Sequence, residues 1–147
     1  MPQYDQDKMV KLVSELRTSV ARLKKLSELS QKQFLADPDK IGSAKYHFIV
    51  AIESSIDMCN HVIARNGYRA PEDYADTFRV MNEAGMFDSD FCDTLVQMAK
   101  FRNRLVHLYW QIDDVQVHEI IQSRLDDFKK FLDDLSAFLG WQQNHNL

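Results

Sequence analysis

Helix-breaking residues are scarce in this chain, which has four glycines and three prolines among its 147 residues. Between these breakers, apolar residues recur at alternating spacings of three and four, the period that places side chains on one face of an α-helix. The clearest run consists of Met9, Val13, Leu16, Val20 and Leu23. The chain has no run of strand-like alternation and no internal repeat. The sequence therefore predicts an all-α fold.

Proline, glycine and capping residues divide this pattern into about five helices. The expected helices run from about Met9 to the break at Asp37-Pro38-Asp39, from about 41 to 65 before Asn66-Gly67, from Pro71 to Gly85, from Asp88 or Ser89 onward, and from Asp113-Asp114 to Gly140. Helices of this number and length are expected to pack as an up-and-down bundle. The length of the chain predicts a single domain that covers residues 1–147.

Charge and cysteine content limit the classes of function. The net charge is −4, and broad electrostatic binding of nucleic acid needs many clustered Lys and Arg, so any contact with RNA must be local. Cys59 and Cys92 lie in apolar helical runs without a CxxC pair, which favours buried thiols in a reducing compartment. The chain has no signal peptide pattern and no apolar stretch long enough to span a membrane. We expect a cytoplasmic protein that makes no membrane contact.

One basic window interrupts the acidic chain. From Thr94 to Ile112 there is no Asp or Glu, and the window contains Lys100, Arg102, Arg104 and His107. On an ideal helix Arg102 and Tyr109 project nearly in line, and Asn103 and His107 form a neighbouring row. Arginine binds phosphate through two hydrogen bonds and histidine exchanges protons near neutral pH, so these groups suit a phosphodiester. The window offers no carboxylate to recruit a metal ion. Spacing alone equally allows an arginine that extends from a core helix and a histidine that caps it.

The residues Arg102-Asn103-x-x-x-His107-x-Tyr109 resemble the Rx4HxY motif of the HEPN superfamily, specifically of the HepT toxin family. The segment 51–64 also resembles the second helix of that family. The likeness covers nearly the whole chain in length, in helix order and in the position of the motif before the last helix.

The resemblance implies a ribonuclease that needs neither metal nor cofactor. Two copies of the chain, or a higher assembly, would face each other across a cleft and cut RNA there. The RNA 2′-hydroxyl would attack the adjacent phosphorus and leave a cyclic phosphate and a 5′-hydroxyl. His107 would act as general base or acid, Arg102 would stabilise charge on the phosphoryl oxygens, and Asn103 would orient either the Arg102–His107 pair or the phosphate.

The resemblance also implies a partner, a nucleotidyltransferase-fold antitoxin that transfers AMP to Tyr109 within a toxin–antitoxin module. A nucleotidyl group on Tyr109 would block RNA by its bulk and negative charge. Without the resemblance, Tyr109 is more simply an aromatic packing residue beside Trp110.

Other assignments stay open at this point. Lys100 and Arg104 are candidate RNA contacts, and Asp57 and Asn60 either support the motif near the cleft or form ordinary hydrogen bonds between helices. Two rival functions are an inactive HEPN subunit that docks a nucleotidyltransferase and a helical adaptor without nucleotide chemistry. The intact set of Arg, Asn, His and Tyr favours the enzyme.

Overall fold

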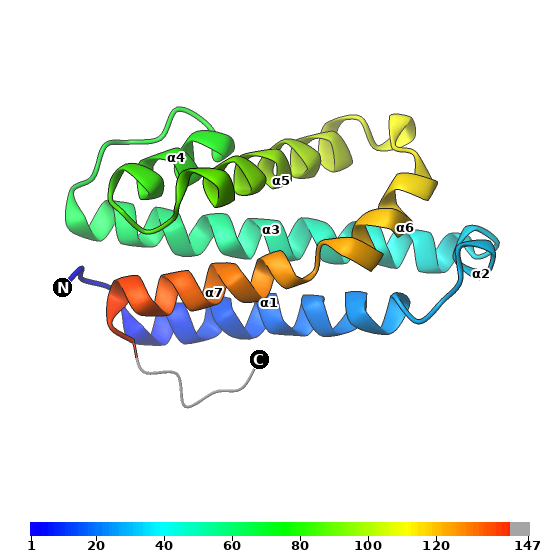
Figure 1. Ribbon diagram of the computed structural model, residues 1–147, viewed down its shortest axis with the longest axis horizontal. Coiled ribbons are helices and arrows are strands. Elements are labelled where there is room, and N and C mark those ends of the chain that lie inside the picture. Colours follow the sequence, from blue (N-terminus) through cyan, green and yellow to red (C-terminus); the bar gives the residue numbers. More distant parts are fainter. Residues whose placement is uncertain (142–147) are drawn as a thin grey trace.

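The computed structural model describes residues 1–141, and all regular structure in this range is helical (Figure 1). The helices are α1 (Gln6–Leu26), α2 (Gln31–Leu35), α3 (Pro38–Asn66), α4 (Tyr74–Glu83), α5 (Ser89–His107), the 3-10 turn η1 (Tyr109–Gln111), α6 (Asp114–Ser123) and α7 (Asp126–Leu139). The all-α prediction is confirmed. No helix in this part of the chain has the length and apolar character of a membrane span.

The long helices run along one axis in alternating directions, and α3 lies at the centre, in contact with α1 and α5 (Figure 1). Ile52, Ile56, Cys59 and Ile63 of α3 are buried because this helix meets neighbours on both sides. The largest fully buried side chains come from most of the helices and include Leu16, Phe34, Phe48, Ile52, Phe78, Phe128 and Phe131. Dense packing of these side chains supplies the apolar burial that stabilises the fold.

Most helix ends follow local sequence signals. Asp37, Asp88 and Asp113 are N-caps, and the Asp88 carboxylate accepts a hydrogen bond of 2.7 Å from the Phe91 amide. At the other ends, Gly67 and Gly140 have φ of +66° and +64°, the left-handed conformation in which glycine avoids a steric penalty.

The predicted count of about five helices is wrong, because the first and last segments each divide. The last segment bends at Arg124, where φ is −122° and ψ is 2°. Gln122 donates to the Ser27 carbonyl at 2.7 Å, which ties α6 to the α1–α2 connection, whereas Phe128 and Phe131 of α7 are buried in the core. These two contacts hold α6 and α7 in different positions, so the helix ends at this point although the segment has no internal glycine or proline.

The predicted start of the third helix at Pro71 is also wrong. The Asp73 carboxylate caps α4 by accepting from the Asp76 amide at 2.7 Å, so the helix begins at Tyr74. Pro71 lies in the preceding loop, and the Asp76 carboxylate fixes that loop through the Glu72 amide at 2.9 Å.

Candidate functional site

The basic window forms the second half of α5 and the turn that follows it. The helix ends at His107, and Leu108 leaves it with φ of −129° and ψ of 38° before η1 begins at Tyr109. The in-line projection of Arg102 and Tyr109 required a continuous helix and is therefore wrong. Tyr109 belongs to a separate local environment.

Arg102 is held on several sides and its side chain is 12% exposed. Its Nε and Nη2 lie 2.9 Å and 2.5 Å from Glu53 Oε1 of α3, and its Nη1 donates to Asn103 Oδ1 at 3.1 Å. The guanidinium also stacks over the Tyr74 ring, with its carbon 4.7 Å from the ring centroid. The position of the guanidinium is thus fixed by α3, by α4 and by its own neighbour on α5.

Glu53 is the site residue that sequence reasoning missed. The basic window contains no carboxylate of its own, but the fold brings Glu53 onto it from a segment 49 residues earlier. Asp57 lies one turn further along α3, and burial together with the nearby Glu53 charge raises the pKa of the Asp57 carboxyl above its ordinary value. One feature of the sequence pointed to this residue: Glu53 is a charged residue among the apolar residues of segment 51–64.

His107 ends α5 in solvent. Its side chain is exposed, and no hydrogen bond to it is found within residues 1–141. It is the last residue of α5. The imidazole is therefore accessible to a ligand.

The other candidate residues are not gathered around Arg102. Lys100 is exposed, and Arg104 stacks near the Phe101 ring and lines a groove of about 220 Å³ formed by α3, α5, α6 and α7. Two residues along a helix correspond to a rotation of about 200°, so Arg104 faces away from Arg102. Asn60 accepts a hydrogen bond of 3.1 Å from Thr77 of α4, which is the ordinary contact between helices that the sequence left open.

Tyr109 lies against a lysine from the start of α3. Lys45 Nζ is 4.2 Å from the centroid of the Tyr109 ring and 3.0 Å from Asp114 Oδ1 of α6. Tyr109 is 46% exposed, and the neighbouring Trp110 is 76% exposed. Tyr109 therefore shows one ring face to Lys45 while part of the side chain stays open to solvent.

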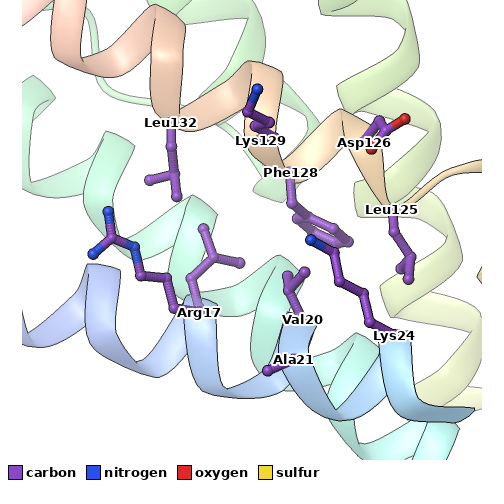
Figure 2. Close-up of a pocket in the computed structure, with 10 residues that line it drawn as sticks. Arg17, Val20, Ala21, Lys24, Leu125, Asp126, Phe128, Lys129 and Leu132 are labelled. Atoms are coloured by element: carbon purple, nitrogen blue, oxygen red, sulfur yellow. The ribbon is translucent and has the colours of Figure 1, made fainter. Parts of the chain in front are cut away.

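A separate groove of about 250 Å³ lies between α1 and α7, with Leu132 and Phe128 of α7 opposite Arg17 and Val20 of α1 (Figure 2). None of the motif residues lines it. Within the described part of the chain, no group of three or more His, Cys, Asp or Glu side chains is arranged to hold a metal ion. The α5 terminus is the place where the motif side chains reach solvent.

Residues 16–135 match the family described as ribonuclease HepT-like. An mRNA nuclease HepT from Shewanella oneidensis is 30% identical over 86 residues, which span 58% of this chain and 64% of that protein, less than two thirds of its length. A putative RNase from Archaeoglobus fulgidus is 26% identical over 107 residues, which span 73% of this chain and 76% of that protein.

Solved structures share the fold. The tri-AMPylated Shewanella oneidensis HEPN toxin, solved in complex with its MNT antitoxin, superposes with a TM-score of 0.83 at 23% identity, covering 89% of this chain and 98% of that chain. The cytosolic protein YutE of Bacillus subtilis, whose function is unknown, superposes with a TM-score of 0.80 at 17% identity, covering 100% and 99%. At these identities the similarity establishes the fold alone.

Proposed function

This chain belongs to the HepT-like ribonuclease family, and we propose that it is the toxin of a toxin–antitoxin module, a ribonuclease that acts as a homodimer. One observation carries this proposal. The Rx4HxY motif places an accessible imidazole, His107, at the solvent end of the helix that also bears the fixed guanidinium of Arg102.

The proposed reaction uses the 2′-hydroxyl of RNA as its nucleophile. His107 removes the 2′-hydroxyl proton as the oxygen attacks the adjacent phosphorus, or protonates the departing 5′-oxygen. The new bond closes a 2′,3′-cyclic phosphate, and the bond to the 5′-oxygen breaks. Arg102 stabilises the charge that develops on the phosphoryl oxygens, and Asn103 orients Arg102 through their hydrogen bond.

The geometry of α5 supports a site shared by two chains. Arg102 and His107 are five residues apart and so differ by about 140° around the helix, which directs them to different sides of one helix. A two-fold axis near the end of α5 would set the His107 of one chain beside the Arg102 of the other. Val106, Leu108 and Trp110 are exposed around this end and supply apolar surface for such a contact.

The proposed regulation is transfer of AMP to Tyr109 by a nucleotidyltransferase-fold antitoxin. The accessible phenol at the end of the motif supports this proposal, as does the MNT antitoxin bound to the AMPylated Shewanella toxin. A nucleotidyl group on Tyr109 would place bulk and negative charge two residues from His107, where RNA is expected to bind.

A second function deserves a test because of the Arg102–Glu53 pair. An arginine already neutralised by a carboxylate is suited to holding a structure together, as an inactive subunit that docks a nucleotidyltransferase would require. This alternative predicts no cleavage, whereas the toxin proposal predicts cleavage that depends on His107.

The deciding experiment is an RNA cleavage assay with the purified chain and a labelled oligoribonucleotide. We expect products that end in a cyclic phosphate, activity that persists in excess chelator, and at least a hundredfold loss in His107→Ala, in line with typical acid–base contributions. His118→Ala is not a suitable control, because His118 is buried and bonds the Leu29 carbonyl. Exposed Lys32→Ala is the matched control. No cleavage by the wild type would refute the ribonuclease assignment, and equal cleavage by wild type and His107→Ala would refute the role of His107.

A further inference from the structure

Lys45 is an unusual residue for a helical core. Within residues 1–141 it is the one lysine or arginine that is buried, at 5% exposure. Removing an ammonium from water costs several kcal/mol unless partners compensate for it. Here the partners are the Asp114 carboxylate at 3.0 Å and the face of the Tyr109 ring at 4.2 Å.

These contacts join three elements, since Lys45 belongs to α3, Tyr109 to η1 and Asp114 to the first turn of α6. The two partners are much more exposed than the lysine, because the Asp114 side chain is 38% exposed and Tyr109 is 46% exposed. The Asp114 oxygen that faces Lys45 is nevertheless buried. The arrangement leaves a buried cation against the ring of a tyrosine that is 46% exposed.

The same arrangement makes Lys45, and not Arg102, the cation next to a modified Tyr109. Arg102 is engaged by Glu53 and Asn103 and stacks on Tyr74, and Tyr109 lies beyond the end of its helix. Among the contacts of the described residues, the cation on the Tyr109 ring is Lys45.

We propose that Lys45 is the positioning residue and counter-ion for nucleotidylated Tyr109. This inference rests on the proposed function and deepens its regulation. In the modification the phenolic oxygen bonds to the α-phosphorus of ATP, the bond from that phosphorus to pyrophosphate breaks, and the phenolic proton passes to solvent. The product is a phosphodiester with one negative charge, attached to the ring that Lys45 already holds. Lys45 then pairs with this charge and shares its ion pair with Asp114.

A fixed anion on Tyr109 tests this pairing without any antitoxin. Sulfotyrosine carries one negative charge on the same oxygen and can be incorporated in place of Tyr109 in the full chain. Melting temperatures are measured with and without the sulfate in wild type, in Lys45→Met and in Lys40→Met. The last variant is the matched control, because Lys40 is exposed near the start of the same helix.

We expect the sulfate to raise the melting temperature, or leave it unchanged, in wild type and Lys40→Met, and to lower it in Lys45→Met. The two responses should differ by roughly 3 °C or more for a chain of this size. The difference should persist in high salt, because a shielded pair is screened weakly. Should Lys45→Met fold poorly, the double variant Lys45→Met/Asp114→Asn removes the unpaired carboxylate and serves as the apolar background.

Equal responses in the two backgrounds would overturn the inference. The outcome is independent of the RNA assay. If the wild type cuts RNA and the sulfate responses are equal, the ribonuclease proposal stands and the role of Lys45 is refuted. If the sulfate responses are unequal and the chain cuts no RNA, the pairing of Lys45 with the anion stands and the toxin function is refuted.

Discussion

At the scale of single residues, the Arg102–Glu53 pair determines what a substitution at Arg102 measures. The Arg102 side chain is 12% exposed and that of Glu53 is 38% exposed, so loss of the arginine leaves a half-buried carboxylate without its partner. Arginine substitutions therefore affect stability as well as chemistry. His107 is not paired in this way, because it is exposed and makes no hydrogen bond in the described part of the chain.

We predict that Arg102→Ala abolishes RNA cleavage and also lowers the free energy of unfolding by about 1–2 kcal/mol, since water screens part of the Glu53 charge. The double variant Arg102→Ala/Glu53→Gln should regain most of that stability and remain inactive. Thermal unfolding and the RNA assay, run on both proteins, separate the two roles. Recovery of cleavage in the double variant would mean that Arg102 serves only to neutralise Glu53.

At the scale of secondary structure elements, the connection from α3 to α4 is held by one carboxylate. Asp76 accepts from Arg69 Nη1 at 2.7 Å, from Arg69 Nη2 at 3.1 Å and from the Glu72 amide at 2.9 Å. The side-chain hydrogen bonds from Arg69, followed by the amide of Glu72, lower the pKa of Asp76 from 3.8 to about 2. The loop before α4 therefore depends on an ionised Asp76.

The lowered pKa gives a prediction for stability against pH. Because the folded-state pKa lies below the ordinary value, ionised Asp76 stabilises the fold above about pH 4, and this contribution is lost as the pH falls from 3.8 to about 2. We expect Asp76→Asn to lower the free energy of unfolding by about 1–2 kcal/mol at neutral pH, after allowance for the exposure of Arg69, and to change it little near pH 2. Unfolding by denaturant at several pH values measures this.

The control for that experiment is Asp133→Asn, because Asp133 is an exposed residue of α7 without an ion pair in the described part of the chain. Its effect should be small at every pH. If Asp76→Asn lowers the free energy of unfolding equally from pH 7 to pH 2, the ionised Asp76 carboxylate is not the cause.

At the scale of the whole molecule, the proposed homodimer needs a surface, and the end of α5 supplies one. Four apolar or aromatic residues around the motif are exposed: Val106 at 41%, Leu108 at 38%, Tyr109 at 46% and Trp110 at 76%. Consecutive exposed apolar residues are typical of a contact with another macromolecule. A two-fold contact there would also complete the proposed catalytic site.

We predict that Val106→Glu converts a dimer into a monomer and lowers RNA cleavage at least tenfold, because burying an unpaired carboxylate at a contact is unfavourable. Val10→Glu is the matched control, since Val10 is 45% exposed on α1, away from the motif. Light scattering measures the mass of each variant. A wild-type monomer at micromolar concentration would contradict the homodimer, and an intact dimer in Val106→Glu would place the contact elsewhere.

The helical class, most helix ends and the family could all be predicted from the sequence, because they depend on residues close together in the chain. Apolar spacing predicts the helices, and Asp88, Gly67 and Gly140 mark ends that the structure confirms. The Rx4HxY residues predicted the HepT family, which the match over residues 16–135 confirms. The roles of Arg102, Asn103, His107 and Tyr109 stay predictions.

Tertiary structure decided the surroundings of those residues, because contacts between distant segments leave no trace in local spacing. Glu53 reaches Arg102 from α3, and Lys45 reaches Tyr109 from the start of the same helix. The bend at Arg124 arises from the hydrogen bond of Gln122 to the α1–α2 connection and from the burial of α7 side chains. The end of α5 at His107, which separates Tyr109 from Arg102, carries no glycine or proline signal. Each of these features depends on which helices pack together, and that packing minimises exposed apolar area over the whole chain.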